Sequence, residues 1–177
     1  VSSRFSHSNL IRGAKCFAIA MAFTLVTSLP VIDQPIRFGV LHLLGFSMLF
    51  YGLVGKALDR IPRIIMPFLY TALLLGSQLL VTRTDIGGAA RYLFMFGWLY
   101  PGFYSADYFP IFPWFFVFLL GTWAGIYIKE RRLPNKFYTF TCPVLPDIGR
   151  HALIVYILHQ PVFYGLIYGI KFLMGGM

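Results

Sequence analysis

The stretch RFGVLHLLGFSMLFYGLVGKAL, residues Arg37 to Leu58, decides the fold class of this chain. It is apolar over the length of a membrane span, because about 20 helical residues cross a hydrocarbon core of about 30 Å. A histidine, His42, lies inside this apolar run. An ionisable side chain within a span is costly and usually faces a partner, a cavity or a pathway. The stretch therefore predicts a transmembrane helix that carries a polar site.

The composition extends this prediction to the whole chain. The sequence is 58% hydrophobic, 19% aromatic and only 12% charged, whereas charged residues make up about a quarter of a soluble domain. We therefore expect an all-α, polytopic transmembrane helix bundle. At 177 residues one domain is expected, residues 1–177. The chain opens on Val1 and a polar, basic segment, so we expect it to start partway through a longer protein, with upstream helices missing.

Apolar runs of sufficient length predict five spans, over residues 14–32, 38–58, 64–82, 109–128 and 152–174. The aromatic segment 89–106 is broken by glycines and a proline, which favours an interfacial or re-entrant segment over a sixth span.

The distribution of basic residues predicts the orientation of these spans. With a cytoplasmic N-terminus, inner loops hold eleven of the 15 Lys and Arg residues and outer loops hold four. This bias follows the positive-inside rule and places the loop 129–151 in the cytoplasm. The formal charge of +9 is thereby explained, and no nucleic-acid partner is expected.

The second span has small residues and a histidine along one side, namely Gly39, His42, Gly45 and Gly52. Small residues allow a neighbouring helix to approach closely, so His42 is expected to point into the bundle. Two roles are open for it. One is a hydrogen bond across a helix interface that serves stability alone. The other is a site role, in which Arg37 near the outer surface binds an anionic or carbonyl group.

Asp107 opens the fourth span in the run DYFP. A carboxylate there predicts a cap for the amides of its own helix. Its position on the same outer side as Arg37 leaves pairing between the two as an alternative.

The fifth span carries His159 next to Gln160 and Pro161. Tyr156 and Gln160 belong to a polar stripe that recurs every four residues, which indicates either packing with satisfied hydroxyls or a substrate track. No nucleophile elbow, phosphate loop or metal-ligand cluster appears, and the two cysteines show no pairing pattern.

Four short motifs occur in order along the chain: IRFGVLHLLG at 36–45, DYFP at 107–110, IGRHAL at 148–153 and LHQP at 158–161. They resemble bacterial inner-membrane proteins related to the heparan-alpha-glucosaminide N-acetyltransferase catalytic domain, within the wider transmembrane acyltransferase superfamily. The resemblance covers most of residues 10–170. Family members begin with further helices that carry an Asp/Arg-Gly motif and a proposed catalytic histidine. This chain has no such segment, which is a further reason to expect a truncated start.

The resemblance implies transfer of an acetyl group from cytoplasmic acetyl-CoA to a sugar acceptor across a bacterial inner membrane. The site residues expected under this reading fall into three groups: His42 and His159 as catalytic residues, Arg37, Asp107, Gln160 and Tyr156 as substrate-binding residues, and Arg150 as a ligand of coenzyme A. A histidine serves as a general base when its pKa lies near the working pH. No metal is expected.

A non-enzymatic protein is the competing reading. Intramembrane histidines with an arginine and an aspartate also suit a proton-coupled transporter, or a structural membrane subunit. Transporters usually show inverted repeats, and none is visible here. The expected partners are the lipid bilayer and a small sugar acceptor, and the small-residue faces leave a homo-oligomer open.

Overall fold

A computed structural model describes residues 2–29, 35–58, 60–139 and 144–174, and its regular elements are all helical over these residues. This confirms the predicted fold class. Within the described part, four helices are long and apolar enough to cross a membrane: His7–Thr27, Val40–Leu58, Ile65–Arg83 and Ile111–Lys129. The number of spans found there is thus four, one fewer than predicted.

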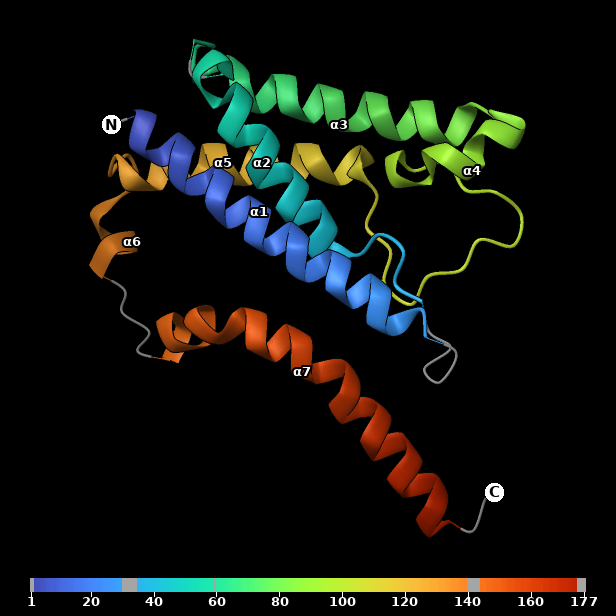
Figure 1. Ribbon diagram of the computed structural model, residues 1–177. Coiled ribbons are helices and arrows are strands. Elements are labelled where there is room, and N and C mark those ends of the chain that lie inside the picture. Colours follow the sequence, from blue (N-terminus) through green and yellow to red (C-terminus); the bar gives the residue numbers. More distant parts are fainter. Residues whose placement is uncertain (1, 30–34, 59, 140–143, 175–177) are drawn as a thin grey trace. The chain divides into compact units, whose positions relative to one another are not determined.

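The elements follow one another as α1 (Ser2–Thr27), α2 (Val40–Leu58), α3 (Ile65–Arg83), η1 (Gly87–Ala89), α4 (Ala90–Leu93), η2 (Phe94–Phe96), α5 (Ile111–Lys129), α6 (Asn135–Thr139) and α7 (Val144–Leu173) (Figure 1).

Two helices start earlier than the apolar runs that predicted them. α1 begins at Ser2 rather than at residue 14, because backbone hydrogen bonds continue a helix through polar residues beyond its apolar part. α7 begins at Val144 rather than at residue 152. Pro146 falls in its first turn, where a missing N–H is tolerated. The apolar part of α7 found among its described residues, Ile148–His159, is shorter than a span, so the fifth span stays a prediction.

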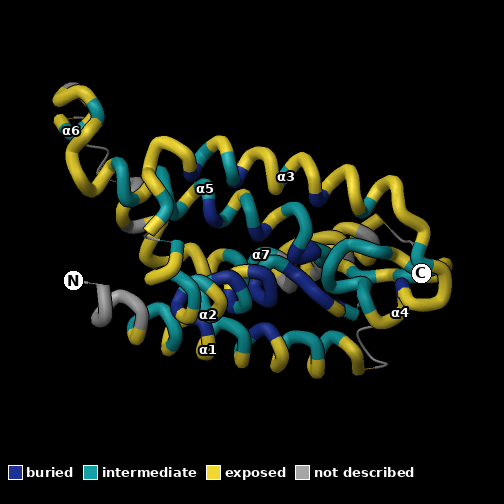
Figure 2. Tube along the Cα trace, turned by 90° about the horizontal axis from the view of Figure 1, so that it is seen from above, coloured by how far each residue is buried: buried dark blue, intermediate teal, exposed yellow. Residues whose placement is uncertain are grey.

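The chain forms two compact units, Val1–Glu130 and Arg131–Met177. In the first unit α1 packs along α2, and α3 packs along α5 (Figure 1). A shared apolar cluster joins the elements, with the buried members Phe38, Leu43, Met66, Tyr70, Ile111, Phe115 and Leu119. In Figure 2 the buried segments are most numerous on α2, whereas much of α1 and α3 is exposed. Large exposed apolar side chains are the surface expected of a chain in lipid.

Two glycines set the distance between α1 and α2. A Cβ on Gly45 would lie 2.7 Å from the backbone nitrogen of Phe17, and a Cβ on Gly13 would lie 2.8 Å from that of Leu49. The predicted close approach at Gly45 is therefore confirmed, with Gly13 as its partner. By contrast, a Cβ on Gly125 would meet no atom within 4 Å in the described structure.

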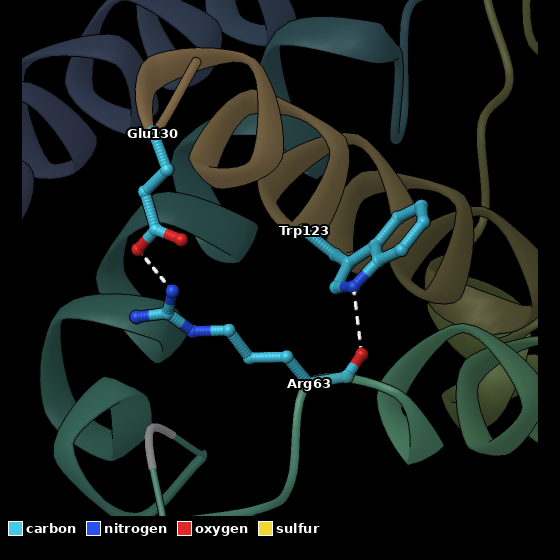
Figure 3. Close-up of polar contacts among 3 residues, drawn as sticks. All are labelled: Arg63, Trp123 and Glu130. Atoms are coloured by element: carbon cyan, nitrogen blue, oxygen red, sulfur yellow. Dashed lines mark hydrogen bonds and ion pairs between the residues drawn. The ribbon is translucent and has the colours of Figure 1, made fainter. Parts of the chain in front are cut away.

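A polar clasp joins the start of α3 to the end of α5. Glu130 pairs with the guanidinium of Arg63, and the indole nitrogen of Trp123 donates to the carbonyl oxygen of Arg63 at 2.9 Å (Figure 3). Arg63 makes one bond with its side chain and the other with its backbone. The two bonds therefore fix where the loop after α2 meets α5.

The aromatic segment between α3 and α5 forms only short turns. η1, α4 and η2 together are too short to cross a bilayer, in agreement with the prediction that this segment is not a span. The hydroxyl of Tyr108 donates to the carbonyl oxygen of Phe94 at 2.6 Å. That bond ties the segment to the residues that precede α5.

Candidate functional site

An extended segment before α2 runs parallel to the segment before α5. The amide of Ala106 donates to the carbonyl of Pro35 at 3.0 Å, and the amide of Phe109 donates to that of Phe38 at 2.9 Å. Each segment leads into a helix, so this pairing brings Arg37, His42 and Asp107 to one end of the first unit. Sequence reasoning had predicted all three as site residues.

His42 is 3% exposed and has a hydrogen-bond contact at each ring nitrogen. The amide of Gly39 donates to its Nδ1 at 3.2 Å. Its Nε2 lies 3.1 Å from the hydroxyl of Thr24, and that hydroxyl donates to the carbonyl of Ile36 at 2.8 Å. The imidazole therefore connects α1, the extended segment and the first turn of α2.

Asp107 caps α2 and not its own helix. Its Oδ2 accepts a hydrogen bond from the amide of Val40 at 3.0 Å. The N-cap of α5 is Pro110, which makes no side-chain cap. The prediction that Asp107 caps the fourth span is thus wrong, because the parallel pairing places its carboxylate at the first turn of α2. Gly39 leaves room for it, since a Cβ there would lie 2.2 Å from Oδ2.

Arg37 is exposed, and both its backbone and its side chain are held by the loop before α5. Its amide donates to the hydroxyl of Ser105 at 3.0 Å, and its guanidinium donates to the hydroxyl of Tyr100 at 3.0 Å. The guanidinium carbon also lies 5.9 Å from the ring centre of Phe103. Ser105 in turn donates to the carbonyl of Asp107 at 2.5 Å. One hydroxyl therefore links the two residues that were predicted to lie together.

A surface pocket of about 480 Å³ lies beside Arg37. Its polar lining comes from the last turn of α1 and from the extended segment, and its apolar lining includes Phe94. The lining residues are Thr24, Thr27, Ser28, Leu29, Pro35, Arg37 and Phe94. Thr24 belongs both to this lining and to the hydrogen bonds of His42, so its hydroxyl connects the buried histidine to the pocket.

The family model described as "Heparan-alpha-glucosaminide N-acetyltransferase, catalytic" matches residues 2–161. The chain belongs to this family. Comparisons with curated proteins and with solved structures found no match. Membership in the heparan-alpha-glucosaminide N-acetyltransferase catalytic family makes the chain a membrane protein of acetyltransferase-like type.

This family member carries its other predicted site residues on α7, in the second unit. The rings of Tyr156 and His159 lie 5.3 Å apart, and Nδ1 of His159 contacts the carbonyl oxygen of Tyr156. A carbonyl only accepts, so in a neutral ring this contact favours the tautomer with the proton on Nδ1. Arg150 is exposed on the same helix, and the side chain of Gln160 lies outside the described residues. The site roles of these residues stay predictions.

Sequence reasoning missed the hydroxyl groups of the site. Thr24 and Thr27 lie in the last turn of α1 and Ser28 follows it directly, a grouping that is visible in the run TLVTS. The role of Ser105 had no such signal, because it depends on pairing with a segment far away in the sequence. Within the described part of the chain, no group of three or more His, Cys, Asp or Glu side chains is arranged to hold a metal ion.

Proposed function

We propose that this protein transfers an acyl group, acetyl in the simplest case, from acyl-CoA to a hydroxyl or amine of a sugar-type acceptor. The family match supports the class of reaction. The pocket beside Arg37 is the single structural observation that carries the proposed acceptor site.

The transfer needs one bond exchange at the thioester carbonyl. The acceptor oxygen or nitrogen attacks that carbon, its C–O or C–N bond forms, and the C–S bond to coenzyme A breaks. The proton lost by the acceptor passes to a base, and the leaving thiolate takes up a proton. His159 is our proposed base, since the tautomer with the proton on Nδ1 leaves Nε2 unprotonated. The basic side chain of Arg150 is a proposed contact for the coenzyme A phosphates.

The pocket suits a ligand that both donates and accepts hydrogen bonds. Within the described residues one guanidinium nitrogen of Arg37 donates a hydrogen bond, to Tyr100, so further N–H groups can donate to ligand oxygens. The proton of Ser28 is committed to the carbonyl of Thr24 at 2.6 Å, so its oxygen is left to accept from a ligand. A sugar hydroxyl next to another sugar oxygen satisfies both groups at once.

A cytoplasmic N-terminus is also part of the proposal, because it places most of the basic residues in inner loops. Labelling of Asn135→Cys, with both native cysteines replaced by serine, tests the orientation. Reaction from the cytoplasmic side alone is the expected result, and reaction with a membrane-impermeant reagent in intact cells contradicts it.

The activity is tested on membranes that contain the protein, with radiolabelled acetyl-CoA and a panel of amino sugars and sugar alcohols. Arg37→Gln is expected to raise the acceptor KM about tenfold, which corresponds to about 1.4 kcal/mol of lost binding. Arg91→Gln is the matched control, because Arg91 is another exposed arginine outside the pocket.

Two outcomes would overturn the proposal. Absence of transfer to every acceptor, together with proton-coupled uptake of a solute, assigns the protein to the transporters. Equal effects of the two arginine substitutions would show that the acceptor does not bind beside Arg37.

A further inference from the structure

We propose that His42 is a positioning residue, which holds the segment that carries Arg37, and not the group that takes a proton from the acceptor. The inference rests on the proposed function in one respect, namely that Arg37, the residue held in place, binds the acceptor. The hydrogen bonds that carry it are independent of any activity.

The tautomer of His42 follows from its partners. A backbone amide can only donate, so the contact from Gly39 requires an unprotonated Nδ1. In a neutral imidazole the proton is then on Nε2, which faces the hydroxyl of Thr24. That hydroxyl gives its own proton to the carbonyl of Ile36. With this assignment, each hydrogen in this series of hydrogen bonds has one acceptor.

The tautomer leaves His42 unable to act as a base toward the pocket. Its lone pair points at the amide of Gly39, and the nitrogen nearest the pocket already carries a proton. Thr24 stands between that nitrogen and the pocket. A base needs an unprotonated nitrogen within reach of the acceptor proton, and His42 has none.

The same bonds match a helix-capping arrangement. Gly39 precedes α2, and the side chain three residues later reaches back to its amide, as Glu or Gln does in a capping box. Glycine has no side chain to complete the box, and Asp107 instead accepts from another amide of the first turn, that of Val40. Two residues from different segments thus share the cap of α2.

This shared cap fixes the position of Arg37. On the side of α2, His42 holds Gly39 and Asp107 holds Val40. On the side of α1, Ile36 is held through its carbonyl by Thr24 and through its amide by Thr27 at 3.0 Å. Arg37 lies between these anchors, so loss of His42 loosens the backbone that places the guanidinium at the pocket.

The first test reads the tautomer directly. Nitrogen-15 NMR of histidine-labelled protein in lipid bilayers distinguishes protonated from unprotonated ring nitrogens, and the signals lost in His42→Gln identify this residue among the 4 histidines. We expect a neutral ring with a protonated Nε2 and an unprotonated Nδ1. A charged ring, or a proton on Nδ1, overturns the inference whether or not the protein transfers acyl groups.

The second test uses kinetics with two substitutions. The oxygen of His42→Gln can accept from Gly39, as in a capping box, whereas His42→Ala cannot. We expect His42→Gln to keep kcat within about threefold and leave the shape of the pH–rate profile unchanged, and His42→Ala to raise the acceptor KM about tenfold. Loss of kcat in both variants, with loss of a limb of the pH profile, means that His42 is catalytic.

Discussion

The carboxylate of Asp107 accepts a hydrogen bond at 3.0 Å from the amide of Val40, 67 residues earlier in the chain. A helix start usually satisfies its free amides with a side chain from its own first turn or from the residue just before it. α2 instead depends on a distant loop, and that dependence makes the contribution of Asp107 measurable.

Asp107→Ala is expected to lower the free energy of unfolding by about 1 kcal/mol, because the amide of Val40 loses its acceptor. Asp107→Asn should recover most of the loss, since an amide oxygen caps nearly as well as a carboxylate. Unfolding in mixed micelles, followed by circular dichroism, measures both. Equal destabilisation by the two substitutions would mean that charge, and not the cap, is what matters.

Gly39→Ala is expected to destabilise the protein by displacing the carboxylate of Asp107, which a Cβ would approach to 2.2 Å. The double variant with Asp107→Ala should then lose less than the sum of the two single losses, because the clash is relieved in it. The same unfolding assay provides the cycle.

Gly125→Ala is the control for this cycle, since a Cβ there meets nothing within 4 Å in the described structure. Replacing a helical glycine in open space should stabilise the helix by about 0.5 to 1 kcal/mol. Additive losses in the double variant Gly39→Ala with Asp107→Ala would contradict the contact between these two residues.

Tyr108 is expected to resist alkaline titration. Burial raises the pKa of Tyr108 to about 12, from an ordinary value of 10.0. The folded protein therefore holds this proton more tightly than the unfolded chain. Its contribution to stability is constant below about pH 10 and is lost as the pH rises to about 12.

The phenolate absorbance of the wild type and of Tyr108→Phe gives the measurement for this tyrosine. Their difference should show one tyrosine that ionises near pH 12, while stability falls less steeply in the variant above pH 10. A difference spectrum with a midpoint near pH 10 would contradict the burial of this hydroxyl.

In the clasp between α3 and α5, the hydrogen bond from the indole of Trp123 should contribute more to stability than the ion pair. Arg63 and Glu130 are partly exposed, with side chains 50% and 31% accessible, so a double-mutant cycle should give a coupling of about 0.5 kcal/mol that weakens in salt. Trp123→Phe removes a hydrogen bond to the carbonyl of Arg63 and should cost about 1 kcal/mol.

Trp114→Phe is the matched control for Trp123, because no hydrogen bond from the indole of Trp114 occurs in the described part of the chain. A coupling well above 1 kcal/mol for the ion pair, or equal losses of stability for the two tryptophan substitutions, would contradict the expectation that the indole hydrogen bond contributes more than the ion pair.

The apolar runs of the sequence predicted the fold well, because lipid demands long uninterrupted helices. The run that opens with Arg37 ends at Leu58, where α2 ends as well. The ends of helices were less predictable where polar residues continue them, as at Ser2 and Val144. Hydrophobicity reports where a helix enters lipid, whereas backbone hydrogen bonds decide where it stops.

The site was predictable in its residue types but not in its connections. Arg37, His42 and Asp107 stood out because charged and ionisable groups are rare in an apolar chain. The partner of each depends on the parallel pairing of two segments far apart in the sequence, which no local pattern encodes. For the same reason Asp107 was assigned to the wrong helix, and Thr24 and Ser105 were missed.

The long-range cap of α2 also sets an order for biosynthesis. When α2 leaves the ribosome and enters the membrane, the residue that will satisfy the amide of Val40 has not yet been translated. The first turn of α2 must stay hydrated at the headgroup level until the loop before α5 arrives, since an unsatisfied amide is costly in hydrocarbon. Insertion of this helix and completion of its hydrogen-bonded first turn are therefore separate events. The second can occur only after about a third of the chain has been translated in addition.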